Sequence, residues 1–130
     1  MPTWVIRSFW NERRGVFQRE YEGHSDATRA KLRAVLNGLR AETEIQGWCR
    51  ENGFDRLSGK YRELGKLRFK VENVQHRPLG FFGPARHEFT LLVWATERGD
   101  SWRPPDVRDT ALTRMKMIID DPRRAHEFDF

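Results

Sequence analysis

The sequence predicts an α+β fold in which an antiparallel sheet of about four to five strands carries the helices on one face. The first observation is that side chains between residues 61 and 98 alternate between apolar and polar, as in a strand. The second is that residues of about 26–42 and 105–120 repeat apolar side chains at helical spacing. The predicted order of elements is strand, strand, helix, short helix, three strands and a closing helix.

The composition is that of one domain covering residues 1–130, because 38% apolar residues in 130 suffice for a single core. No segment approaches the roughly 20 apolar residues of a membrane span, and the N-terminus lacks a signal peptide's apolar stretch, so we expect a cytoplasmic protein without membrane contact. The single cysteine, Cys49, and the lack of zinc-site spacing predict no disulfide, metal or other cofactor. The net charge of +5 favours anionic partners, nucleic acid first and an acidic protein second.

The N-terminal hairpin and helix are expected over about residues 4–42. Residues 4–10 and 16–21 are rich in β-branched and aromatic types, and the turn-like NERRG between them predicts a strand, a turn and a second strand or extended arm. Ser25 is a suitable N-cap for the helix that follows, with leucines on one stripe and arginines on the other. Whether those arginines are solvated or bind a partner is left open.

A short helix is predicted for about residues 44–51, ending near Glu51 because Asn52-Gly53 interrupts it, with Trp48 reaching the core. Strands of about 62–71, 75–82 and 88–96 then form an antiparallel meander with short connections. Pro78 and Gly80 predict a bulge or irregular pairing in the middle strand.

The alternation sorts the first of these strands into two faces. Three apolar side chains enter the core and three basic ones leave it together: Leu67, Phe69 and Val71 against Lys66, Arg68 and Lys70. The closing helix starts at the Pro104-Pro105 pair, stops before Pro122 and has its apolar face at Val107, Ala111, Met115 and Ile118 or Ile119.

Four segments in this order resemble the RelE/ParE toxin superfamily, and most closely its HigB-like, phage-derived branch. They are LSGKYREL (57–64), RPLGFF (77–82), FTLLVWATER (89–98) and PPDVRDTALTRM (104–115). The resemblance implies a compact RelE-like domain that cuts messenger RNA on the ribosome, without a metal, through the ribose 2′-hydroxyl. It also implies a cognate antitoxin as partner and leaves the oligomeric state open.

The resemblance places catalytic residues at Arg77 and Arg98, as stabilisers of transition-state charge, and at Lys66 or Arg68, for phosphate positioning or proton transfer. Further RNA contacts are expected from Lys70, His76, Trp102 and Arg103. Trp102 is a candidate for base stacking because it lies in a loop beside Arg103. His76 titrates near neutral pH in its ordinary state, but it points away from Arg77 unless a bulge intervenes, and a plain cross-strand role stays open.

The alternative hypothesis is a non-catalytic member of the same fold, either a gyrase-directed inhibitor or a phage accessory protein that binds nucleic acid. Residues 106–108 hold no tyrosine or histidine where some relatives do. Glu97 stands next to Arg98, where an acid competes with phosphate for the arginine. The resemblance leads us to expect an endoribonuclease, and these two departures keep the non-catalytic alternative open.

Overall fold

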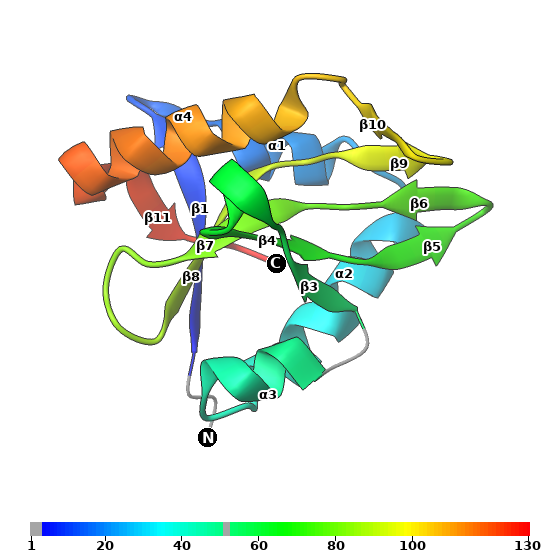
Figure 1. Ribbon diagram of the computed structural model, residues 1–130, viewed down its shortest axis with the longest axis horizontal. Helices are drawn as coiled ribbons and strands as arrows, with labels where there is room; N and C mark the ends of the chain where they lie inside the picture. The colour runs from blue at the N-terminus through cyan, green and yellow to red at the C-terminus, as the bar shows by residue number, and fades with distance from the viewer. Residues whose placement is uncertain (1–3, 51–52) are drawn as a thin grey trace.

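Two β-sheets form the centre of the protein in this computed structural model, which describes residues 4–50 and 53–130 (Figure 1). The seven-stranded sheet has the order β11-β1-β8-β7-β4-β3, with β2 paired to β1, and the four-stranded sheet has the order β10-β9-β6-β5. The strands of the larger sheet are β1 (Val5–Asn11), β2 (Arg14–Gly15), β3 (Phe54–Arg56), β4 (Leu64–Leu67), β7 (Leu79–Phe82), β8 (Glu88–Val93) and β11 (Ala125–Glu127). Those of the smaller sheet are β5 (Phe69–Val71), β6 (Val74–His76), β9 (Thr96–Arg98) and β10 (Ser101–Arg103).

Each of the three predicted meander strands is split between the two sheets. Residues 62–71 form β4 and β5, residues 75–82 form β6 and β7, and residues 88–96 form β8 and the start of β9. The antiparallel meander is confirmed in both sheets, since β4, β7 and β8 pair in this sense, as do β5, β6 and β9. Within the meander, the chain therefore crosses from one sheet to the other three times.

The predicted irregularity at Pro78 is confirmed and lies at this crossing. The Leu67 amide donates to the Pro78 carbonyl at 2.9 Å, and the Arg77 amide donates to the Ala95 carbonyl at 2.7 Å. A register shift follows between Leu79 and Gly80. Because proline has no amide donor, the ladder breaks here, and the smaller sheet extends beyond the larger one.

The predicted second strand at residues 16–21 is wrong, because this segment is helix α1 (Val16–Glu22). Phe17 and Tyr21, one helical turn apart, are both buried, so tertiary packing overrides the strand preference of the aromatic residues. The purely antiparallel sheet is also corrected, since β1 pairs with β8 in parallel. A parallel pair needs a long connection between its strands, and residues 12–87 supply it.

Helix α2 (Asp26–Arg40) confirms the predicted helix, and the Ser25 hydroxyl caps it by accepting a hydrogen bond from the Thr28 amide at 3.2 Å. Its leucine stripe is buried at Leu32, Leu36 and Leu39. Helix α3 (Ile45–Arg50) matches the predicted short helix and buries Trp48 completely, whereas the predicted end near Glu51 and Asn52 lies outside the described residues.

Helix α4 (Val107–Asp120) confirms the predicted closing helix, with Ile118 buried while Ile119 is 57% exposed. The prediction of helices on one face only is wrong. Helices α1, α2 and α3 pack on one face of the larger sheet around Trp48 and Phe89, and α4 packs on the other around Leu79 and Leu92 (Figure 1).

The C-terminal tail lies back on the domain. After the short helix η2 (Pro122–Arg124), β11 pairs antiparallel with β1, and the Phe128 amide donates to the Ile6 carbonyl. Phe128 is buried between Phe17 and Tyr21. None of the helices in the described part of the chain has the length and apolarity needed to cross a membrane.

Candidate functional site

The two faces of the four-stranded sheet carry different chemistry. Pairing across β5, β6, β9 and β10 aligns one row of side chains, namely Lys70, Gln75, Glu97 and Trp102. We call the face that holds this row the outer face. The neighbouring row, Phe69, His76, Thr96 and Arg103, lies on the opposite, inner face, because successive side chains of a strand alternate.

The outer face contains a half-buried ionic cluster, called here the Glu97 cluster, which consists of Lys66, Arg77 and Glu97. The Lys66 ammonium lies 3.2 Å from Oε1 of Glu97, and Nε of Arg77 lies 2.9 Å from the same oxygen. Their side chains are 20%, 12% and 16% exposed for Lys66, Arg77 and Glu97, respectively. Ion pairs this far from bulk water are screened less by salt than surface pairs are.

The position of Arg77 is fixed by three acceptors. Besides Glu97, its Nη2 donates to Oε1 of Gln75 at 2.6 Å, and its Nη1 donates to the His76 carbonyl at 2.9 Å. Three of the five guanidinium N–H donors are thus used within the protein. Both cations bind Oε1 of Glu97, and Oε2 has no hydrogen bond to another described residue.

Aromatic rings form a wall beside this cluster. The Lys66 ammonium lies 5.3 Å from the Trp102 ring centroid, and the Arg108 guanidinium lies 5.7 Å from the same ring and 4.7 Å from that of Tyr61. Nε of Arg108 is buried and has no hydrogen-bond partner among the described residues. Trp102 therefore holds two cations by cation–π attraction, which differs from the freely exposed stacking ring that the sequence suggested.

Tyr61 and Asp109 connect this wall to the start of α4. The Tyr61 hydroxyl donates to Oδ1 of Asp109 at 2.6 Å, and the Lys60 ammonium lies 3.6 Å from the same oxygen. The hydrogen bond from Tyr61, and then the charge of Lys60, hold the pKa of Asp109 below its ordinary value. Asp109 is consequently ionised at neutral pH and orients the Tyr61 hydroxyl.

His76 lies on the inner face and is buried. Its Nδ1 accepts a hydrogen bond from Nε1 of Trp94 at 3.1 Å, and its ring stacks on Phe69 with centroids 5.2 Å apart. Burial lowers the pKa of His76 to about 4, and the charges of His24 and Arg77 act in the same direction. The predicted RNA contact requires an exposed imidazole, and the structure instead makes His76 a neutral part of the core.

Arg98 and Arg103 are exposed and lie on the side opposite to the Glu97 cluster, because each is next in sequence to a residue of the outer row. Arg68 is held elsewhere, by an ion pair to Asp55 at 2.6 Å. Lys70 belongs to the outer row and is exposed. Of the eight predicted site residues, the structure thus brings Lys66, Lys70, Arg77 and Trp102 to one face.

Sequence reasoning treated Glu97 as a competitor and missed its place at the centre of the site. The two-residue turn Gly99-Asp100 is the signal that could have revealed it, since such a turn pairs residue 97 with residue 102. The contributions of Tyr61 and Arg108 had no comparable local signal. Within residues 4–50 and 53–130, no group of three or more potential metal ligands is found.

No family model matches the chain, and no solved structure matches it. The RNA replication protein of Indian citrus ringspot virus is 32% identical over 76 residues, which are 58% of this chain and 5% of the viral protein. The chain thus spans about one twentieth of the length of that relative, and the likeness does not define a family to which the chain belongs.

Proposed function

We propose that this protein is a toxin-type endoribonuclease that cuts messenger RNA on the ribosome and is held inactive by an antitoxin. The observation that carries the proposal is the Glu97 cluster, in which one carboxylate and two cations share a partly exposed sheet face. Carboxylate and cation together provide the base and the charge stabilisation that metal-free RNA cleavage needs. The ordered resemblance to the RelE/ParE superfamily supports the same proposal.

In the proposed reaction, Glu97 removes the proton of the ribose 2′-hydroxyl, and the 2′-oxygen attacks the adjacent phosphorus. The bond to the 5′-oxygen breaks, and this leaving oxygen takes a proton from the Lys66 ammonium. Arg77 and Lys66 stabilise the negative charge that grows on the phosphoryl oxygens. The products are a 2′,3′-cyclic phosphate and a 5′-hydroxyl end, and proton exchange with water restores Glu97 and Lys66.

The second candidate is a non-catalytic protein of the same kind, a gyrase inhibitor or a nucleic-acid-binding accessory protein. The observation that favours it is that Glu97 already neutralises Lys66 and Arg77. A protein that only binds an anionic partner needs no catalytic base. Lys66 and Arg77 would then leave the Glu97 carboxylate and pair with the negative charges of the partner.

The test is expression of the full chain from an inducible promoter, with growth measured and 5′-hydroxyl RNA ends mapped across the transcriptome. We expect growth arrest and cuts inside translated reading frames. Glu97→Gln keeps the shape of the side chain but removes the base, so cleavage in a translation extract should fall by about 100-fold or more. Glu63→Gln, at an exposed glutamate outside the cluster, is the matched control.

Normal growth without new RNA ends would overturn the enzymatic proposal, and inhibition of DNA supercoiling would then establish the gyrase alternative. If Glu97→Gln cuts as well as Glu63→Gln, the cleavage site lies elsewhere on the molecule.

A further inference from the structure

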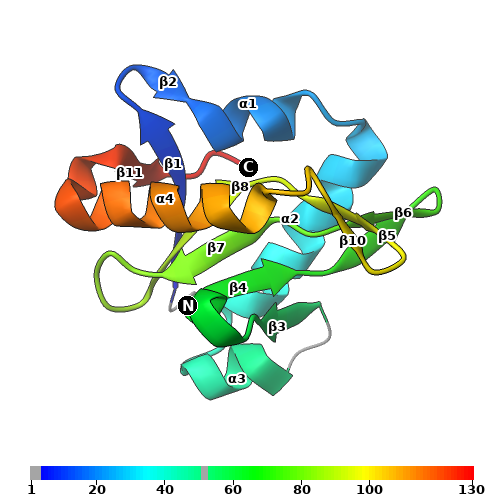
Figure 2. The ribbon, with the colours of Figure 1, turned by 45° about the horizontal axis from the view of Figure 1, so that its top comes forward.

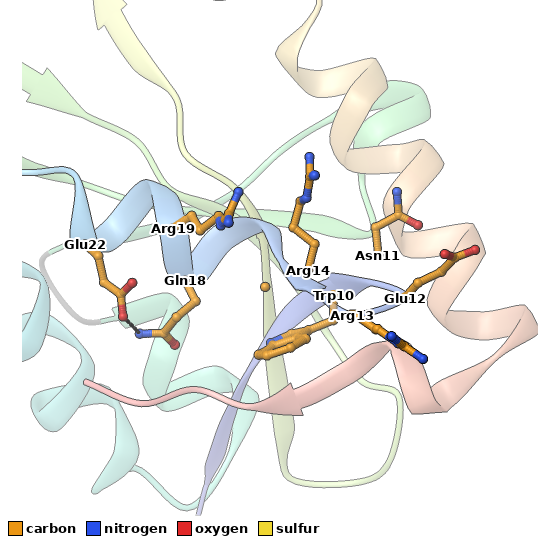
Figure 3. Close-up of a pocket in the computed structure, with 9 residues that line it drawn as sticks. Trp10, Asn11, Glu12, Arg13, Arg14, Gln18, Arg19 and Glu22 are labelled. Carbon is orange, nitrogen blue, oxygen red and sulfur yellow. Dashed lines mark hydrogen bonds between the residues drawn. The ribbon is translucent and has the colours of Figure 1, made fainter.

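A second basic surface lies between the β1–β2 hairpin and α1, where a groove of about 760 Å³ opens (Figure 3). Strand pairing of Trp10 with Gly15 and of Asn11 with Arg14 leaves a two-residue turn at Glu12-Arg13. We call this feature the hairpin groove. In both views the hairpin lies on the other side of the molecule from the tip of the four-stranded sheet (Figures 1 and 2).

Trp10 gives the groove a rigid wall. Its indole stacks on His126 of β11, with ring centroids 4.2 Å apart and an interplanar angle of 8°. A Cβ atom at Gly15 would come within 2.9 Å of the indole, so glycine is needed for this close packing. The hairpin is therefore held against the C-terminal strand, and the arginines that follow Trp10 start from a fixed backbone.

Three arginines of the hairpin groove, Arg13, Arg14 and Arg19, are exposed and have no ion pair or side-chain hydrogen bond with another described residue. Arg14 and Arg19 extend to the same side, whereas Arg13 extends away from them (Figure 3). Some arginines elsewhere on the surface are paired with carboxylates, as in Arg29–Asp26, Arg68–Asp55 and Arg123–Asp121. Others, such as Arg86, Arg98 and Arg103, are exposed and form no ion pair with another described residue, so the groove is distinguished by bringing several such arginines together.

Two carboxylates also line the groove, and neither forms an ion pair with its arginines in the described part of the chain. Glu22 accepts a hydrogen bond from Gln18 at 3.3 Å, and Glu12 occupies the hairpin turn. A further guanidinium, that of Arg124, is brought to the hairpin by its hydrogen bond to Asn11 at 3.1 Å. The groove thus gathers guanidinium groups that form no ion pair with a carboxylate of the described residues and are accessible to an external anion.

We propose that the hairpin groove is an RNA-binding surface that contacts the phosphate backbone of double-helical RNA through Arg14 and Arg19, with Arg13 at its rim. Guanidinium groups bind phosphate oxygens in a bidentate manner, and two of them on the same side of the groove offer separate contacts to the phosphates of one nucleic-acid backbone. Such contacts fix the position of a protein on RNA without reading its sequence. Binding at this surface does not depend on cleavage at the Glu97 cluster.

The test measures binding of a fluorescein-labelled RNA duplex of about 16 base pairs by anisotropy. The full chain carries Glu97→Gln throughout, so that RNA is not cut. In this background, Arg14→Ala/Arg19→Ala is compared with Arg86→Ala/Lys116→Ala, which removes the same charge from exposed positions elsewhere. Binding is followed from about 50 to 200 mM KCl.

We expect Arg14→Ala/Arg19→Ala to weaken binding of the duplex. The salt slope, which is the steepness with which the logarithm of the binding constant falls with the logarithm of the KCl concentration, should decrease by about 1 for each lost phosphate contact. The Arg86→Ala/Lys116→Ala control should keep the slope of the parent. Equal slopes for the two double variants would overturn the proposal, as would a parent protein that does not bind the duplex at about 50 mM KCl. Arg19→Glu, compared with Lys116→Glu, gives a second and independent comparison, with the larger loss expected for Arg19→Glu.

Discussion

The inner and outer faces of the four-stranded sheet are built from the same strands and have opposite properties. His76 and Arg77 are neighbours in sequence, yet His76 is neutral within an aromatic core while Arg77 is charged and bound to Glu97. On the inner face, Trp94 donates to His76 and stacks with His24 at 4.0 Å. One residue of sequence separation is therefore enough to exchange a structural role for a chemical one.

The same contrast holds for two tryptophans. Trp94 is 6% exposed and contacts Phe17, Phe69 and His76, whereas Trp102 is half-buried and faces Lys66 and Arg108. The inner ring fills the core, and the outer ring orients charges. Mutations on the two faces should therefore separate effects on stability from effects on activity.

The largest effect is expected at the inner tryptophan. Trp94→Ala should lower the free energy of unfolding by about 3–5 kcal/mol, because it leaves a cavity in the aromatic core and the His76 imidazole without its donor. Trp102→Ala should cost about 1 kcal/mol, since it mainly removes the cation–π contacts of a half-buried ring. Urea denaturation of both variants gives the comparison, and equal losses would show that the two faces are not distinct.

The next effect concerns activity on the outer face. Arg77→Ala removes one of the two cations on Glu97, so we expect cleavage to fall by about 100-fold, an effect typical of losing one charge stabiliser of the transition state. Arg86→Ala, at an exposed turn, is the control and should be unchanged. Both are measured as initial cleavage rates in a translation extract. Unchanged cleavage by Arg77→Ala would mean that the ionic cluster is only structural.

A smaller effect is expected from the pH dependence of stability on the inner face. The pKa of His76 is lowered from 6.5 to about 4 in the folded protein, so the unfolded chain binds the proton more readily. The stability that neutral His76 contributes is complete above pH 6.5 and is lost as the pH falls toward 4. Between about pH 7.5 and 5 this amounts to about 2 kcal/mol.

His76→Gln should remove that loss, because an amide accepts the Trp94 hydrogen bond and does not titrate in this range. The measurement is the free energy of unfolding from urea denaturation at about pH 7.5 and 5, compared between the wild type and the variant. Burial raises the pKa of Glu20 to about 7, which stabilises the folded state as pH falls, but this contribution is present in both proteins and cancels. Parallel pH profiles for the two proteins would contradict the buried, neutral His76.

The sequence was sufficient to predict α2, the three meander segments and the burial of Trp48, because these features follow from local periodicity and residue type. It was insufficient for α1, whose aromatic residues favour a strand until Phe17 and Tyr21 find a core to fill. The site depended on the crossing between sheets at Pro78. Local patterns do not determine how a broken strand continues, so the meeting of Arg77 with Glu97 was not predictable.

The smallest effect tests which side chains of β9 and β10 lie on the face of the Glu97 cluster. Arg98 and Arg103 were expected to stabilise the transition state and to bind RNA, but each faces away from the Glu97 cluster because it follows Glu97 or Trp102 by one residue. Side chains on that side do not reach the Glu97 cluster and contribute little to RNA cleavage. Arg98→Ala and Arg103→Ala should therefore each change the cleavage rate by less than about threefold. A loss in either variant comparable to that of Arg77→Ala would mean that RNA wraps around the edge strand β10 and that both faces of the sheet meet the substrate.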